Sequence, residues 1–569
     1  MSERGSPRPS CCALLGAAAV IATTLAMAAA APAAAAPVPL AQFGSAGSDA
    51  GEFGLPQDIA VDGAGDVYVA DTARHRINVF GGDGTFIRAF GWGVDTGAVA
   101  FEVCTTASGC QAGTPGGGAG QLDDPEGLAI DGAGGLYVSD TDNARISVFS
   151  TAGPSFTRAF GWGVDTGAAA FEVCTTASGC QAGTPGGGAG QLDNPRGVEL
   201  DGAGSLYVSD GFNDRISVFS TAGPSFTHAF GWGVDSGALA FEVCTTASGC
   251  ETGRFGNGAG QLASPSGVAL DGAGNLYVGG GVSARINVFA TAGPSFTRAF
   301  GWGVDTGATA FEVCTTASGC EMPIPGAGAG QLDAPTGVGI DGTGNLNVVD
   351  TNNNRISAFA TAGPSFTRAF GWGVDTGAMA FEVCTTASGC QVGSSGGGVG
   401  QLSFPTGLGI DCRGAVWVAD TSNNRVQRFG EPGTPLPPCT SSGGGSGGGS
   451  SGSPLATVPS NHFDLGKLLK NKKKGIAFLL VNVPGPGELG LSGKGVQPIG
   501  GGAGIARKSL AVSGGEARLR IAPTKGKKGR KVRRKLREKG KAKLKVLVTY
   551  VPTGGLANTQ TTKVKLVRR

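Results

Sequence analysis

A long internal repeat constrains the fold of this chain more than any other feature of its sequence. A segment of alternating apolar residues followed by Asp-Gly-x-Gly begins at Pro125 and recurs every 70 residues, at Pro195, Pro265, Pro335 and Pro405, and a further copy begins at Pro56. Each copy contains four short alternating runs separated by turn residues, and such runs predict β-strands. Four antiparallel strands repeated six times predict an all-β, six-bladed β-propeller, because radial repetition leaves few strand edges exposed.

The copies resemble the NHL repeat, whose pattern is G-x-G-Q-L-x-x-P-x-G-V-A-x-D-x-x-G-x-L-Y-V-x-D-x-x-N-x-R-I-x-V-F. The resemblance covers about residues 38–430. It implies a six-bladed propeller over residues 37–439, of a secreted bacterial type with extended blade loops. Two copies depart from the pattern, because Gly280 replaces the second aspartate of the fourth copy and Asn347 replaces the tyrosine of the fifth.

The two ends of the repeat region are predicted to meet. The sixth copy ends at Phe429 without the Ser-Phe-Thr-Arg-Ala-Phe segment that forms the predicted outer strand of most other copies. Residues 40–44 have a suitable pattern for that strand, so we expect the sixth blade to contain both chain ends. A disulfide between Cys412 and Cys439 would then tie the last turn to the segment that follows.

Each copy except the fourth carries an Asp/Arg pair around one turn. Aspartate can accept hydrogen bonds from nearby backbone amides, and arginine can reach across the turn to the carboxylate. We therefore predict a structural and not a catalytic role for Asp71/Arg76, Asp140/Arg145, Asp210/Arg215, Asp350/Arg355 and Asp420/Arg425.

An insertion of almost constant sequence separates the copies and carries two cysteines six positions apart. Outside the cytosol such a pair favours a disulfide, whereas zinc prefers shorter spacings and a histidine nearby. The predicted disulfides are Cys104/Cys110, Cys174/Cys180, Cys244/Cys250, Cys314/Cys320 and Cys384/Cys390.

These five inserts are also the candidate ligand-binding region. They connect successive blades, and the resemblance to known propellers implies that such connections lie on the face where the central channel opens, so the inserts are expected to form a crown around one mouth. Each brings aromatic residues and acids together, which suits a carbohydrate or cationic peptide, and the acids could hold Ca²⁺. The alternative is that Trp92 and Phe101 and their counterparts only pack the inserts. The candidate residues are Trp92, Asp95, Glu102, Trp162, Asp165, Glu172, Trp232, Asp235, Glu242, Trp302, Asp305, Glu312, Trp372, Asp375 and Glu382.

No catalytic constellation or metal site is visible in the sequence. The three histidines, His75, His228 and His462, share no motif. Residues 444–448 fit a nucleophile-elbow pattern only formally, because they lie in a Gly/Ser-rich segment without strand or helix signals. Propeller enzymes such as lyases and lactonases use metal-binding or base residues in the channel, and no such set is recognisable. We expect no enzyme and no cofactor, and an extracellular lyase-like or lactonase-like enzyme with a metal in the channel mouth is the alternative.

The remaining segments indicate export and a second domain. Residues 1–36 combine basic residues, an apolar run and a small-residue exit, as in a secretory signal. An uncleaved membrane anchor is the alternative to its removal. A Gly/Ser-rich linker follows the repeats at 440–457, and short strand-like runs in 458–569 suggest a basic, immunoglobulin-like β-sandwich.

Charge is divided sharply along the chain. From residue 461 onward, 27 Lys and Arg face 4 acids, a net charge of +23, which leaves −21 for the residues before. Such asymmetry indicates an interaction surface. We expect binding to an envelope polyanion, with plain solubility as the alternative and nucleic acid disfavoured because no aromatics interleave with the charges. The candidate residues are Lys525, Lys527, Lys528, Arg530, Lys531, Arg533, Arg534, Lys535, Lys541, Lys543 and Lys545.

The sequence therefore predicts a secreted, cell-surface scaffold without catalytic activity. Its propeller would recognise a protein, peptide or carbohydrate ligand, and its C-terminal domain would attach to the envelope.

Overall fold

The computed structural model describes residues 36–432, 464–473, 475–492, 510–524, 526–552 and 558–568. The linker, Lys525, Cys439 and all but the last residue of the predicted signal lie outside these ranges. No helix among the described residues is long and apolar enough to cross a membrane.

Residues 38–430 form six antiparallel sheets, five of which have five strands. The first sheet contains β2 (Pro56–Val61), β3 (Val67–Asp71), β4 (Arg76–Phe80), β5 (Phe86–Trp92) and β6 (Phe101–Cys104). The second contains β7 (Pro125–Ile130), β8 (Gly135–Asp140), β9 (Arg145–Ser150), β10 (Ser155–Trp162) and β11 (Phe171–Cys174). The third contains β12 (Pro195–Leu200), β13 (Ser205–Asp210), β14 (Arg215–Ser220), β15 (Ser225–Trp232) and β16 (Phe241–Cys244).

The other three sheets repeat this arrangement. The fourth contains β17 (Val268–Leu270), β18 (Asn275–Gly279), β19 (Arg285–Ala290), β20 (Ser295–Trp302) and β21 (Phe311–Cys314). The fifth contains β22 (Pro335–Ile340), β23 (Asn345–Asp350), β24 (Arg355–Ala360), β25 (Ser365–Trp372) and β26 (Phe381–Cys384). The sixth contains β27 (Leu408–Ile410), β28 (Val416–Asp420), β29 (Arg425–Gly430) and β1 (Val38–Phe43). Short 3₁₀ turns occupy Thr72–Arg74, Gly211–Asn213, Thr351–Asn353 and Thr421–Asn423.

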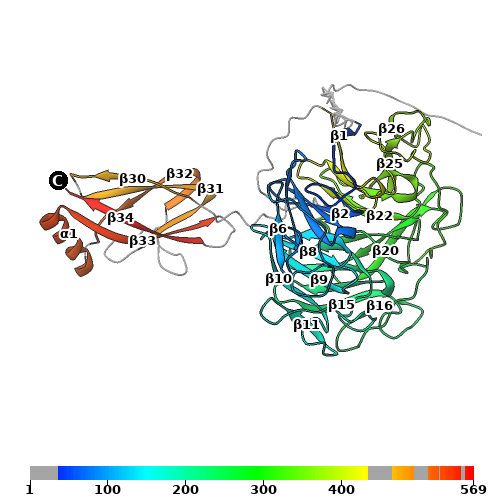
Figure 1. The fold of residues 1–569 in the computed structure, drawn as a ribbon, viewed down its shortest axis with the longest axis horizontal. Coiled ribbons are helices and arrows are strands. Elements are labelled where there is room, and N and C mark those ends of the chain that lie inside the picture. The colour runs from blue at the N-terminus through cyan, green and yellow to red at the C-terminus, as the bar shows by residue number, and fades with distance from the viewer. Residues whose placement is uncertain are drawn as a thin grey trace, which may run out of the picture.

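The first strands of the six sheets contact one another in a closed ring. β2 contacts β7, the contacts continue through β12, β17 and β22 to β27, and β27 contacts β2 again. Strand β1 pairs antiparallel with β29, from Val38 opposite Gly430 to Phe43 opposite Val426 (Figure 1). This pairing confirms that the two ends of the repeat region meet in the last sheet.

The apolar core lies between neighbouring sheets. One cluster combines Ile77, Val79 and Phe90 of the first sheet with Leu128 and Phe149 of the second, and similar clusters join the sheets that follow. Ile77 and Val79 alternate with Arg76 and Asn78 along β4, so in this strand the alternation that predicted it also explains how the sheets pack.

Each insert adds a fifth strand to its sheet, which the sequence analysis did not predict. In the first sheet, β6 pairs with β5 so that Phe101 lies opposite Trp92 and Cys104 opposite Ala89. The disulfide-stapled hairpin therefore extends the outer edge of the sheet, farthest from the inner strand, and does not stand at the channel.

The C-terminal residues form a sheet of β30 (Asp464–Asn471), β31 (Ile476–Ser492), β32 (Leu510–Ile521), β33 (Lys541–Pro552) and β34 (Asn558–Val567). One helix, α1 (Lys527–Lys539), packs Val532 and Leu536 into the same apolar core as the strands. The basic run after Lys525 is therefore helical, although the sequence analysis placed it in an all-strand domain. Several predicted short strands join into the long β31 and β32. The immunoglobulin-like sandwich is not confirmed.

Candidate functional site

The turn of every repeat except the fourth holds its Asp/Arg pair in a buried, structural position. Arg145 Nε donates to Asp140 Oδ2 at 2.8 Å, and both side chains are fully buried. The other guanidinium nitrogens donate to backbone carbonyls, among them Gln121 at 2.9 Å in the preceding insert and Gln181 at 3.0 Å in the following one. The arginine thus ties consecutive inserts together, as predicted for a structural role.

Within each insert, the glutamate that was a candidate ligand-binding residue accepts hydrogen bonds from the turn of the same insert. Glu172 Oε2 accepts the backbone amides of Asp165 and Thr166, each at 2.9 Å, and Oε1 accepts the Thr166 hydroxyl. The Thr166 hydroxyl and these amides hold the pKa of Glu172 below its usual value. Glu102, Glu242, Glu312 and Glu382 make the same contacts.

The aromatic residues of the inserts serve largely in packing. Phe171 stacks on Phe219 of the next sheet with ring centroids 5.8 Å apart, and the equivalent phenylalanines do the same. Trp92, Trp162, Trp232, Trp302 and Trp372 are half-buried at the ends of their outer strands. Asp95, Asp165, Asp235, Asp305 and Asp375 lie beside them, also half-buried. Each insert therefore gathers its predicted residues, but the five groups are separated around the outer edge of the ring.

Five disulfides confirm the predicted pairing within the inserts, between Cys104 and Cys110, Cys174 and Cys180, Cys244 and Cys250, Cys314 and Cys320, and Cys384 and Cys390. Cys412 belongs to the described residues but Cys439 does not, so their pairing stays a prediction.

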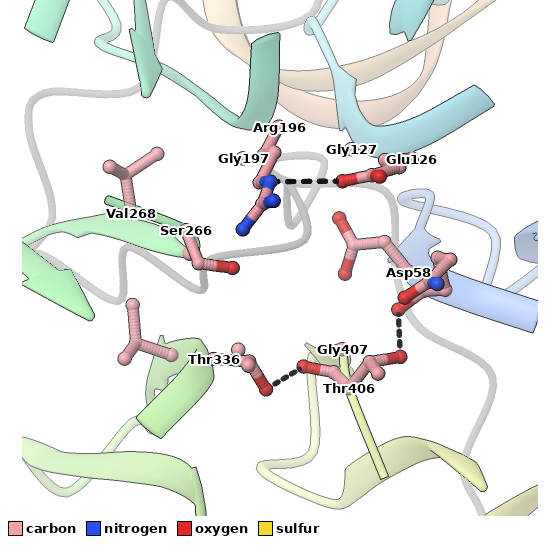
Figure 2. Close-up of a pocket in the computed structure, with 14 residues that line it drawn as sticks. Asp58, Glu126, Gly127, Arg196, Gly197, Ser266, Val268, Thr336, Thr406 and Gly407 are labelled. Atoms are coloured by element: carbon pink, nitrogen blue, oxygen red, sulfur yellow. Dashed lines mark hydrogen bonds and ion pairs between the residues drawn. The ribbon is translucent and has the colours of Figure 1, made fainter. Parts of the chain in front are cut away.

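The structure assembles a different site at the start of the inner strands. A cavity of about 250 Å³ is lined by residues from all six repeats (Figure 2). The lining side chains are Gln57, Asp58, Glu126, Arg196, Ser266, Val268, Thr336, Val338 and Thr406, with glycines between them. None of the lining residues belongs to a stapled insert.

Glycines bring the inner strands close together around this cavity. A Cβ atom at Gly127 would lie 2.0 Å from the carbonyl oxygen of Arg196 in the next sheet, and one at Gly197 would lie 2.4 Å from that of Ser266. The first repeat has Asp58 at this position, and its Oδ2 accepts the amide of Leu128 across the junction at 3.0 Å. At the junction between the first and second sheets, the Asp58 carboxyl group therefore links two inner strands, whereas at the next junctions a glycine lets the two backbones approach each other directly.

Charge is distributed unevenly around the cavity. Glu126 and Arg196 form an ion pair at 3.7 Å, and both remain about a quarter exposed, at 26% and 29%. Burial raises the pKa of Glu126 to about 7, against the effect of Arg196. Burial also raises the pKa of Asp58 to about 8, and Glu126 adds to the rise.

The opposite side of the cavity carries hydroxyl groups. The Thr336 hydroxyl donates to the Thr406 carbonyl at 2.6 Å, and the Thr406 hydroxyl donates to the Gln57 carbonyl at 2.8 Å, as Figure 2 shows. The cavity therefore offers two acids and one guanidinium on one side and hydroxyls on the other, an arrangement that suits a polar ligand.

The sequence analysis missed this site, although the sequence contained a signal for it. The residue after the repeat proline differs in most copies, reading Gln57, Glu126, Arg196, Ser266, Thr336 and Thr406, whereas its neighbours are nearly constant. This variable position lies between a constant proline and, in five copies, a glycine, and closure of the ring brings the six residues to one place.

One further cluster contains potential metal ligands. His75 Nδ1 lies 3.3 Å from Asp123 and 3.7 Å from Asp124. The same nitrogen accepts the backbone amide of Asp124 at 3.2 Å, so its lone pair is already engaged. This cluster is separate from the axial cavity, and we assign it no ligand.

The basic residues of the C-terminal part lie largely on its surface. Lys541, Lys543 and Lys545 are exposed and alternate with buried residues of β33. Lys543 lies opposite Lys565, and Lys545 opposite Lys563, on the neighbouring strand. Lys527, Lys528, Arg530, Lys531, Arg534 and Lys535 are exposed on α1, whereas Arg533 is half-buried and donates to the Thr524 carbonyl at 2.6 Å.

The closed ring of antiparallel sheets around an axial cavity defines a β-propeller. The NHL repeat family matches residues 53–80, 122–149 and 402–429. The chain thus contains matched NHL repeats in the first, second and sixth sheets of this propeller.

Solved structures with a similar arrangement include streptogramin B lyase, at 13% identity, covering 66% of this chain and 93% of that chain with a TM-score of 0.35. Virginiamycin B lyase from Staphylococcus aureus is 10% identical, covering 66% of this chain and 94% of that chain, with a TM-score of 0.30. A chain of the nidogen/laminin complex is 16% identical, covering 55% and 79%, with a TM-score of 0.29. These similarities carry no argument about ligand or activity. No curated protein sequence matches the chain.

Proposed function

We propose that this protein is an exported, six-bladed NHL propeller that binds a ligand without catalysis and is held at the cell surface by its basic C-terminal part. The axial cavity carries the binding half of this proposal, because it gathers one variable position from each of the six repeats and combines charged groups with hydroxyls. A polar ligand, such as the end of a peptide or a saccharide, fits its mixture of charges and hydroxyls. The five disulfides support an oxidising, extracellular location.

The binding site is tested by measuring binding of the full chain to arrays of envelope glycans and peptides. A double variant with Glu126→Gln and Arg196→Gln keeps the net charge and removes the ion pair. We expect it to bind about ten-fold more weakly or worse, because charged hydrogen bonds to the ligand are lost.

A matched control carries alanine at Asp95, Asp165, Asp235, Asp305 and Asp375, the candidate acids of the inserts. It should bind like the unaltered chain. Loss of binding in the control alone would place the site on the inserts, as the sequence first suggested. If no probe binds either the unaltered chain or the variants, the binding function itself is wrong.

The attachment half of the proposal rests on the lysines of β33 and β34. Like charges directly opposite each other destabilise a sheet, and a polyanion would relieve this repulsion. Salt should therefore weaken binding, because the polymer releases counterions when it binds.

The expected attachment is measured by retention on an immobilised anionic polymer at increasing salt. Lys543→Glu with Lys545→Glu should elute at lower salt than Arg518→Glu with Arg520→Glu, which makes the same charge change on β32. Equal elution of the two variants would show that only the net charge matters. Deleting residues 458–569 should also release the protein from cells at low salt.

A lyase-like or lactonase-like enzyme is the second candidate function. The two acids with raised pKa values at the cavity favour it, because such groups can exchange protons near neutral pH. A metal that stays bound through dialysis, and whose removal by a chelator abolishes turnover, would support this candidate.

A further inference from the structure

The fourth repeat lacks the carboxylate around which the other five organise a buried set of hydrogen-bond donors. In the first repeat, Asp71 Oδ2 accepts from Arg76 Nε at 2.8 Å and from Asn78 Nδ2 at 3.1 Å. Its other oxygen accepts the amide of Gly54 at 2.6 Å. The carboxylate therefore neutralises a buried guanidinium and satisfies two further donors.

Glycine occupies the aspartate position in the fourth repeat, but the donors remain. Arg285 and Asn287 are both fully buried. The terminal nitrogens of Arg285 donate to the carbonyls of Asn257, Gly258 and Gln261. Among the described residues, however, neither Arg285 Nε nor Asn287 Nδ2 has a hydrogen-bond partner.

Strand register places these two donors as in the first repeat. Asn287 pairs with Val278 in β18 and with Ala299 in β20, as Asn78 pairs with Val69 and Ala89. In the first repeat the equivalent nitrogens converge on one carboxylate oxygen. The turn itself is tighter in the fourth repeat, because a Cβ atom at Gly280 would lie 2.3 Å from the Ser283 carbonyl oxygen.

The charge of Arg285 also lacks a local counterpart. Burial lowers the pKa of Arg285 to about 10, and no acid counteracts this effect. A buried cation without a partner is costly to a folded protein, so a negative charge at this position would stabilise the fourth repeat. Water could satisfy the hydrogen bonds but could not neutralise the guanidinium.

We propose that the fourth repeat binds a small monovalent anion, of the size of chloride or formate, between Arg285 Nε and Asn287 Nδ2, in place of the missing aspartate carboxylate. The anion accepts one hydrogen bond from each nitrogen. This site is independent of the axial cavity and of the proposed ligand.

The direct test is crystallisation of the full chain in sodium bromide, with diffraction measured at the bromine absorption edge. We expect an anomalous peak within hydrogen-bonding distance of both nitrogens. A second data set from crystals in formate distinguishes a halide site from one that also accepts carboxylates. Density without an anomalous peak, of the size of one water molecule, would overturn the proposal.

A solution test uses thermal unfolding at constant ionic strength, with chloride replacing the bulky anion gluconate. Specific binding should raise the unfolding midpoint by about 2 °C or more as chloride increases. Replacing residues 280–284 by the sequence of residues 350–354 restores the aspartate with its own turn, and this variant should lose the chloride dependence. The same dependence in both proteins would also overturn the proposal.

The converse variant, Asp350→Gly, removes the carboxylate beside Arg355 in the fifth repeat. If the inference is correct, this variant should be less stable than the unaltered chain, and chloride or formate should raise its unfolding midpoint. Should this variant fail to fold, the exchange of residues 280–284 and the bromide experiment still decide the question.

Discussion

At the scale of single residues, the buried Asp/Arg pair is the main polar element of every repeat except the fourth. The guanidinium of Arg215 contacts one carboxylate and the carbonyls of two inserts, and neither partner of the pair is exposed to solvent. A buried pair of this kind adds little stability compared with apolar residues, but removal of one partner leaves an uncompensated charge.

We therefore predict that Asp140→Ala lowers the free energy of unfolding by about 3–5 kcal/mol, because it leaves Arg145 buried and unpaired. Denaturant unfolding of the full chain measures this loss. Asp142→Ala is the matched control, since Asp142 is exposed on the same turn, and it should change stability by less than about 0.5 kcal/mol. Equal effects of the two variants would contradict the structural role of the pair.

The acid at the first junction of the ring predicts a pH dependence. In the unfolded chain Asp58 loses its proton near pH 3.8, whereas in the folded chain its raised pKa keeps the proton to about pH 8. Between these values the folded state binds more protons, so the free energy of unfolding falls as pH rises. Because the cavity opens to solvent, we expect a loss of about 1–2 kcal/mol between about pH 5 and 8.

Asp58→Asn tests this expectation, because asparagine still offers an oxygen to the Leu128 amide but does not titrate. Its stability, measured by denaturant unfolding at both pH values, should fall less with rising pH than that of the unaltered chain. A slope of the same size in both proteins would assign the pH dependence to other groups, of which Glu126 is the nearest.

At the scale of elements, each insert is a stapled hairpin that widens its sheet. The disulfide lies beneath the outer strand, where Cys104 and Cys110 pack with Ala89 and Val94. It closes a loop of only a few residues, so its effect on the entropy of the unfolded chain lies at the lower end of the usual range for disulfides.

We predict that Cys174→Ala with Cys180→Ala costs about 2 kcal/mol and leaves the propeller folded. Hydrogen exchange should show faster exchange in β11 and unchanged protection in β8 and β9. Protection lost throughout the sheet would mean that the insert, and not the four-stranded part, determines the stability of the repeat.

At the scale of the whole molecule, closure of the ring depends on a strand from one end of the repeat region. Phe43 of β1 lies 4.3 Å from Phe80 of the first sheet and 6.0 Å from Trp417 of the last, measured between ring centroids. The strand thus joins the last sheet by hydrogen bonds and the first by packing.

Removal of residues 38–43 should expose the edge of β29 and separate the two ends of the ring. Exposed strand edges pair with other chains, so we expect a lower unfolding temperature and self-association in gel filtration. Phe43→Ala keeps the backbone pairing and tests packing alone; it should destabilise the protein by about 3 kcal/mol without self-association. A monomeric, fully stable deletion variant would show that the ring closes without β1.

Local patterns in the sequence were sufficient for much of this architecture. Alternating residues and turn glycines identified the first four strands of each complete repeat, and cysteine spacing identified five disulfides. Lys541, Lys543 and Lys545 alternate with apolar residues in the sequence, and this alternation corresponds to an exposed and a buried face of β33. The sequence analysis did not predict the helix α1 after Lys525, although Val532 and Leu536 lie four residues apart, a spacing typical of one helix face.

The sequence alone determined the repeat, its strands, its buried ion pairs and its disulfides, because each depends on residues that are close together in the chain. Tertiary structure decided where the binding chemistry lies. Asp58, Glu126 and Arg196 are about 70 residues apart in successive copies, and only the closed ring brings them to one cavity. The position of the stapled inserts was also decided by tertiary structure. Hydrogen bonds between β6 and β5 hold the first insert at the outer edge of its sheet, away from the cavity.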